Sequence, residues 1–134
     1  MKSAKQETVP IASSSDVVVA RQKVRQWAIE MKFTLVDQTK LVTAASELAR
    51  NALEHGKGGH MVIEQVENSV KSGLKLVFED RGPGIIDVEA ALRDGFTTGG
   101  GMGLGLSGSK RLSHEFDIVS APGQGTRVSI VRWK

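Results

Sequence analysis

Several features are missing from this 134-residue sequence, and each absence excludes a class of protein or site. There is no cysteine, which excludes disulfide bridges, thiolate zinc sites, iron–sulfur clusters and a cysteine nucleophile. No run of about 18 apolar residues exists, so no membrane-spanning helix is expected. The opening letters MKSAKQETVP lack the apolar stretch of a secretory signal. We therefore expect a cytoplasmic protein that does not bind membranes.

Aromatic residues and charge of one sign are also scarce. Two tryptophans and four phenylalanines are the whole aromatic content, and 18 basic residues are interspersed with 15 acidic ones. Nucleic-acid binding, which favours basic residues interleaved with aromatics, is not expected. The length and the 40% hydrophobic content fit one folded domain over residues 1–134, with residues 1–7 as a flexible polar tail.

Hydrophobic periodicity predicts the order of the elements. Apolar residues at three- and four-residue spacing predict helices, and alternation of apolar and polar residues predicts strands. The expected helices cover residues 17–31, 36–55, 87–93 and 104–113. The expected strands cover residues 8–11, 60–66, 74–79, 116–120 and 126–133. Grouped hairpin strands outside a strand–helix alternation predict an α+β two-layer sandwich, with helices covering a mixed, mostly antiparallel sheet.

A first polar motif lies inside the second expected helix, in the stretch Glu47-Leu48-Ala49-Arg50-Asn51. Glu47 and Asn51 are four residues apart, so they share one helix face with the apolar Leu48. An amide oxygen suits Mg²⁺, and a carboxylate can orient or deprotonate a hydroxyl group. A surface Glu–Asn pair without a role is the alternative interpretation.

A second motif, Asp80-x-Gly82-x-Gly84, ends the strand expected over residues 74–79. Two glycines let a planar ligand approach the backbone closely, and the carboxylate of Asp80 could accept a hydrogen bond from the amino group of a purine. An ordinary Asp–Gly, Pro–Gly turn is the alternative.

Seven of the fifteen glycines lie between Gly95 and Gly108, and they include the third motif. This motif is Gly99-Gly100-Gly101-Met102-Gly103-Leu104-Gly105-Leu106, and a helix is expected to follow it. Backbone N–H groups and a helix N-terminus together can hold phosphates. A flexible linker is the alternative, but linkers use serine, whereas alternating apolar residues indicate packing.

In this order the three motifs resemble those of the GHKL ATP-binding fold (the Bergerat fold). Glu47–Asn51 resembles its N box, Asp80–Gly84 its adenine box and Gly101–Leu106 its second glycine box. The resemblance covers about residues 8–134. The sequences from Glu47 to Gly56 and Phe96-Thr97-Thr98 are similar to the small bacterial serine kinases and anti-sigma factors, above all the RsbT-type kinases of the stressosome.

The resemblance implies a set of site residues. Glu47 would be the general base, and Asn51 would bind Mg²⁺, which bridges the phosphates of ATP. Asp80 would bind the adenine amino group, with Thr126 assisting through water. The further nucleotide contacts would come from the helix end, the two glycine boxes and the segment before the second box. These residues are His55, Gly82, Gly84, Thr97, Thr98, Gly101, Met102, Gly103, Leu104, Gly105 and Leu106. The short stretch between Gly84 and Gly101 implies a short lid over ATP.

The implied activity is that of a protein serine/threonine kinase that depends on ATP and Mg²⁺. By resemblance, its substrate and binding partner is a small STAS-domain protein, of the RsbS or RsbR type, in a stress or sigma-factor partner-switching pathway, with a phosphatase or a sigma factor as further partners. One alternative is a non-catalytic regulator, an anti-sigma factor or phosphatase activator, that uses ATP as a structural cofactor. Another is the ATP-binding part of a split histidine kinase.

Overall fold

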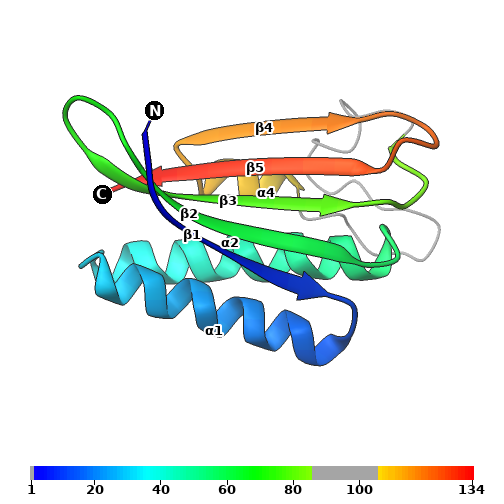
Figure 1. The fold of residues 1–134 in the computed structure, drawn as a ribbon, viewed down its shortest axis with the longest axis horizontal. Coiled ribbons are helices and arrows are strands. Elements are labelled where there is room, and N and C mark those ends of the chain that lie inside the picture. Colours follow the sequence, from blue (N-terminus) through cyan, green and yellow to red (C-terminus); the bar gives the residue numbers. More distant parts are fainter. Residues whose placement is uncertain (1, 86–105) are drawn as a thin grey trace.

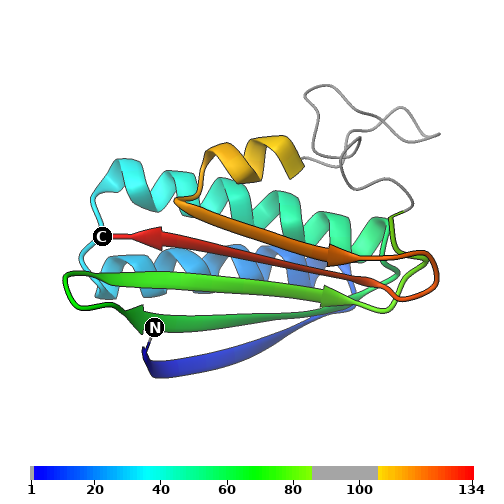
Figure 2. The same ribbon diagram turned by 90° about the horizontal axis from the view of Figure 1, so that it is seen from above.

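The structure is a computed structural model that describes residues 2–85 and 106–134. Its centre is a five-stranded sheet in the order β1-β2-β3-β5-β4, and the described helices cover one face of it (Figures 1 and 2). The strands are β1 (Lys2–Ile11), β2 (Gly59–Glu67), β3 (Ser72–Asp80), β4 (Glu115–Ser120) and β5 (Thr126–Trp133). The helices are α1 (Ser14–Glu30), α2 (Leu35–Glu54) and α4 (Leu106–Arg111). This arrangement confirms the α+β sandwich.

The two long helices begin at side-chain caps that the sequence supplies. The Oγ atom of Ser13 accepts a hydrogen bond from the backbone N–H of Asp16 (3.4 Å), and Oγ1 of Thr34 accepts one from that of Asp37 (3.2 Å). Both helices present an apolar stripe to the sheet. The stripe of α2 consists of Leu41, Val42, Ala44, Ala45, Leu48, Ala49 and Ala52. Its small residues let the helix pack close to the strands.

The covered face of the sheet is built from rows of residues that pair across β3, β5 and β4. One row is Leu76, Ile130 and Phe116, and the next is Phe78, Val128 and Ile118. All six belong to the hydrophobic core or pack against it. Because side chains on a strand alternate between faces, the following row on this face is Asp80, Thr126 and Ser120. The apolar core therefore gives way to polar residues at this end of the sheet.

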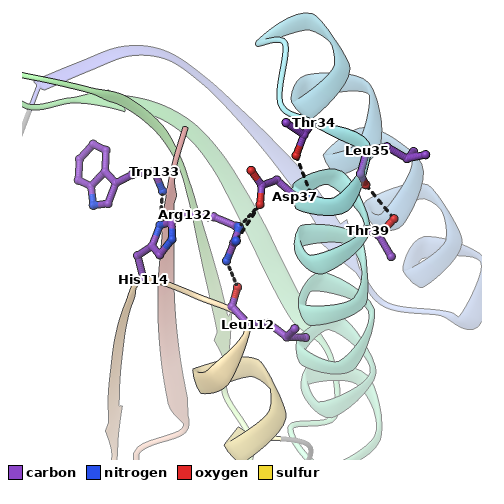
Figure 3. A network of polar contacts seen from close by, with 8 residues as sticks. All are labelled: Thr34, Leu35, Asp37, Thr39, Leu112, His114, Arg132 and Trp133. Atoms are coloured by element: carbon purple, nitrogen blue, oxygen red, sulfur yellow. Dashed lines mark hydrogen bonds and ion pairs between the residues drawn. The ribbon is translucent and has the colours of Figure 1, made fainter.

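The opposite end of the core is closed by an ion pair (Figure 3). Nε and Nη2 of Arg132 donate to Oδ1 of Asp37 at 3.1 and 2.7 Å, and Nη1 donates to the carbonyl oxygen of Leu112 at 2.8 Å. The Arg132 side chain is only 11% exposed. These bonds join β5 to the start of α2 and to the chain just after α4.

Several details differ from the sequence predictions. The polar tail expected over residues 1–7 was wrong for residues 2–7, which belong to β1 and pair with β2. Glu7 faces inward there and accepts a hydrogen bond from Nε1 of Trp27 (2.9 Å), a contact that polarity alone could not reveal. A mixed, mostly antiparallel sheet was expected, and every strand pair within the described residues is antiparallel. In the described part of the fourth expected helix, α4 ends at Arg111 rather than 113.

Two further expectations, the helix over 87–93 and the glycine-rich loop over 97–103, lie outside the described residues. None of the helices that the structure describes is long and apolar enough to cross a membrane.

Candidate functional site

A pocket lies where the core turns polar, between the last turns of α2 and the ends of β3 and β5. Its walls come from α2 and the turn after it, from β3 and its following turn, and from the first residues of α4 and β5. The lining residues are Leu48, Asn51, Ala52, His55, Gly56, Phe78, Asp80, Gly84, Ile85, Leu106, Thr126 and Val128. Six of the predicted site residues are thus brought together: Asn51, His55, Asp80, Gly84, Leu106 and Thr126.

The last turns of α2 supply two polar side chains of the pocket. Asn51 and His55 are four residues apart, and the backbone N–H of His55 donates to the carbonyl oxygen of Asn51 at 2.9 Å. Nε2 of His55 is buried and has no hydrogen-bond partner among the described residues. Because a buried polar atom without a partner is costly, this nitrogen is suited to a ligand in the pocket.

Asp80 is the acidic group of the pocket. Burial raises the pKa of its carboxyl group above the usual value, and hydrogen bonds from the backbone N–H groups of Gly82 and Thr126 partly oppose this rise. The bond from Gly82 reaches Oδ1 at 2.9 Å. The backbone of the turn therefore fixes the carboxyl group in place.

Glycines around Asp80 allow the chain segments to approach one another closely. A Cβ atom on Gly56 would lie 2.2 Å from Cγ of Asp80, and one on Gly82 would lie 2.5 Å from Cα of Gly56. Gly84 has a φ of +78°, and a Cβ atom there would meet the carbonyl oxygen of Ala121 at 2.0 Å. Gly82 and Gly84 were predicted as site residues. Gly56 was not among the predicted site residues, although it follows His55 directly.

Ser120 was missed by the sequence analysis. Its Oγ atom contacts Oγ1 of Thr126 at 2.8 Å, accepts from the backbone N–H of Ile85 at 2.8 Å and donates to the carbonyl oxygen of Gly125 at 3.0 Å. Only the strand order could have indicated this serine as a site residue, because Ser120 lies opposite Thr126 once β4 is placed beside β5.

Glu47 lies one helical turn before Asn51 but does not line the pocket. Its Oε1 atom is 3.0 Å from Nη1 of Arg50, and both side chains are 40% exposed. An exposed pair at this spacing contributes only a few tenths of a kcal/mol, about 0.3–0.5 kcal/mol, so it opens readily. Glu47 is therefore accessible to solvent and lies outside the lining of the pocket.

The remaining predicted nucleotide contacts cannot be placed. They are Thr97, Thr98, Gly101, Met102, Gly103, Leu104 and Gly105, together with the lid, and all lie outside the described residues. The apolar walls Leu48, Ala52, Phe78 and Val128 are buried core residues, and their position next to the polar row makes them part of the pocket as well.

Comparison with known proteins gives a consistent result. The family described as "Histidine kinase-, DNA gyrase B-, and HSP90-like ATPase" matches residues 36–134. Serine/threonine-protein kinase RsbT of Bacillus subtilis is 46% identical over 128 residues, which cover 96% of each chain. The anti-sigma F factor of Thermoanaerobacter sp. (strain X514) is 29% identical over 128 residues, covering 92% of this chain and 89% of that protein.

A solved structure supports the fold. The crystal structure of the RsbU and RsbW domains of a Mycobacterium tuberculosis protein superposes with a TM-score of 0.66 at 20% identity. The superposition covers 97% of this chain and 33% of that one, so the chain corresponds to one part of the larger protein. Together with the family match, this confirms the resemblance drawn from the motifs, and the chain belongs to the histidine kinase-, DNA gyrase B- and HSP90-like ATPase family.

Proposed function

We propose that this chain is a protein serine/threonine kinase that uses ATP and acts as a switch protein in a partner-switching pathway. The observation that carries the proposal is the convergence of Asn51, His55, Asp80 and Thr126 on one pocket of an ATPase-family fold. The 46% identity to a kinase named RsbT across nearly the whole chain supports the choice of activity.

The pocket is the proposed site for the adenine end of ATP. Phe78 and Val128 offer apolar surface to a planar base, and Asp80 offers an acceptor for its amino group. Thr126 lies directly across the β3–β5 pair from Asp80, so both side chains reach the same group. On the opposite wall, Nε2 of His55 can donate to a ribose or phosphate oxygen. Gly101, Gly103 and Gly105 remain the proposed phosphate-binding residues.

Mg²⁺ fits the chemistry of the residues present. Asn51 lines the pocket, and its amide oxygen is a hard ligand of the kind that Mg²⁺ accepts. Within residues 2–85 and 106–134, no three His, Cys, Asp or Glu side chains cluster to hold a metal on their own. That is consistent with an ion that takes most of its ligands from phosphates and water. When bound, the ion would neutralise phosphate charge.

Glu47 is the proposed general base. In phosphoryl transfer the protein mainly positions the groups and accepts one proton from the attacking hydroxyl. The exposed position of Glu47 lets a serine or threonine of a protein substrate reach it, and its ion pair with Arg50 must open when that hydroxyl arrives. Asn51 on the next turn of the same helix keeps the base and the phosphate end of the nucleotide in fixed relation.

The proposed substrate is a STAS-domain protein, of the RsbS or RsbR type, that also binds the kinase. A phosphatase and a sigma factor are the further proposed partners, and the cytoplasm is the proposed location. Similarity to the anti-sigma F factors favours a second candidate, a regulator that binds ATP as a structural cofactor without transferring phosphate.

The deciding experiment compares Glu47→Gln with wild type, using labelled ATP, Mg²⁺ and candidate STAS-domain proteins. A kinase should lose about 10²–10⁴-fold in rate without its base while it still binds ATP. Glu54→Gln is the matched control, because Glu54 is an exposed carboxylate two helical turns away. Wild type that binds ATP but labels no partner would support the regulator, and an acid-labile product would indicate phosphohistidine and a histidine kinase.

A further inference from the structure

The polar row at the end of the core contains a residue with no part in the function proposed above. Asp80, Thr126 and Ser120 are cross-strand partners on β3, β5 and β4. Asp80 and Thr126 line the pocket, whereas Ser120 does not and stands behind Thr126. Ser120 is partly buried, and all its polar contacts within the described residues are short, from 2.8 to 3.0 Å.

The hydrogen bonds of Ser120 fix the direction of each proton. A serine hydroxyl has one hydrogen to donate and two lone pairs to accept with. The N–H of Ile85 can only donate, so it occupies one lone pair of Ser120. The carbonyl oxygen of Gly125 can only accept, so it takes the single hydrogen.

One lone pair of Ser120 is then left for Thr126. The contact between the two hydroxyl groups therefore has Thr126 as the donor. As a result, Thr126 has no hydrogen to offer the pocket, and its free lone pairs can only accept a hydrogen bond.

We propose that Ser120 is a positioning residue that holds the Thr126 hydroxyl as an acceptor and so selects purines with an amino group at position 6. This inference rests on the proposed nucleotide-binding function. An exocyclic amino group carries two hydrogens, one for Asp80 and one for Thr126. A 6-oxo purine presents an oxygen there, which finds no donor in the Thr126 hydroxyl.

A purely structural role for Ser120 makes a different prediction. Ser120 also ties Ile85, a pocket wall, to the β4–β5 turn, and Gly123 supports the same contact by donating to the carbonyl oxygen of Pro83 at 2.7 Å. Loss of that tie would weaken the binding of every nucleotide alike. If Ser120 instead fixes Thr126 as an acceptor, its loss would change the ratio between the affinities for 6-amino and 6-oxo purine nucleotides.

The test measures equilibrium binding of ATP and inosine triphosphate to wild type, Ser120→Ala and Ser120→Thr. In Ser120→Ala the Thr126 hydroxyl is free to turn and donate, so the preference for ATP should fall by about three- to tenfold, the worth of one neutral hydrogen bond. Ser120→Thr keeps the hydroxyl on a partly exposed strand position and should keep the preference. In a Thr126→Val background, the Ser120→Ala change should leave the ratio unaltered.

The inference would be overturned if Ser120→Ala bound ATP and inosine triphosphate with the wild-type affinity ratio. It would also be overturned if Ser120→Ala still changed this ratio in the Thr126→Val background. Neither result would contradict ATP binding itself. Wild type that binds neither nucleotide would instead refute the proposed function. If Ser120→Ala does not fold, Ser120→Cys gives the same measurement, because a thiol keeps the shape but is a weak hydrogen-bonding group.

Discussion

The close approach of Gly56 to Asp80 leads to a strong prediction for Gly56→Ala. The added Cβ atom would lie 2.2 Å from Cγ, 2.4 Å from Oδ2 and 2.5 Å from Cβ of Asp80. Carbon atoms in contact are normally about 3.5–4.0 Å apart, so the two segments must separate by about 1 Å or more. Rotation of Asp80 cannot relieve the clash, because its own Cβ is among the atoms met.

The expected cost has two parts. Overpacking of this kind lowers the free energy of unfolding by about 1–3 kcal/mol. Displacement of Asp80 would also break its proposed hydrogen bond to the adenine base. A hydrogen bond to a charged group contributes about 1.5–3 kcal/mol, so its loss should lower ATP affinity by about 10- to 150-fold. The affinity should therefore fall more clearly than the stability.

Titration calorimetry with ATP and urea denaturation measure the two quantities separately. Gly108→Ala is the matched control, because a Cβ atom on Gly108, in α4, meets no atom of residues 2–85 or 106–134 within 4 Å. Alanine is the better helix former, so this control should keep its affinity and gain stability, by about 0.4–1 kcal/mol. Gly56→Ala that binds ATP within twofold of wild type would refute the geometric reasoning.

Two further predictions concern charge in the fold. Arg132→Met leaves Asp37, whose side chain is 26% exposed, without its partner, and should lower the free energy of unfolding in urea by about 2–4 kcal/mol. Lys23→Met is the control: it removes only the exposed ion pair with Glu7 and should lower the free energy of unfolding by less than about 1 kcal/mol. The hydrogen bond from Arg132 lowers the pKa of Asp37, so the pair stabilises the fold above about pH 4. Urea denaturation at a series of pH values should show that this stabilisation disappears as the pH falls through the lowered pKa. Burial raises the pKa of Asp80, so its ionised form destabilises the fold at neutral pH. Asp80→Asn should therefore raise the melting temperature at pH 7 and weaken ATP binding; a lower melting temperature would contradict this.

Local patterns were sufficient to predict most of the fold. The apolar stripe of α2 and the alternation along β5 specify an element and its buried face without reference to any other segment. Residues 2–7 could not be predicted in this way, because they form an edge strand whose inward Glu7 is satisfied by Trp27, 20 residues away. The first part of β1 is therefore defined by tertiary contacts, whereas its end over residues 8–11 was predicted from the sequence.

The candidate site likewise contains residues that the sequence could indicate and residues that it could not. Asn51 and Asp80 lie in short motifs whose spacing indicates chemistry, and the family resemblance added His55, so all three were candidates before the pocket was seen to bring them together. Ser120 and Gly56 acquire their roles from neighbours that the strand order and the chain crossing bring together. Such roles cannot be inferred from spacing along the chain.

The two ends of α2 have different surroundings, and this gives the helix a second significance. Leu35 and Val36 at its start are 70% and 63% exposed, although they are large apolar residues, while Asn51 in its last turns lines the pocket. A helix of 20 residues is about 30 Å long and stiff over that length. A protein that bound this exposed end would contact the same stiff helix that carries Asn51, a proposed nucleotide contact, near its other end. The one helix α2 would then couple the binding of a partner to the binding of the nucleotide, with no hinge or second domain between the two positions.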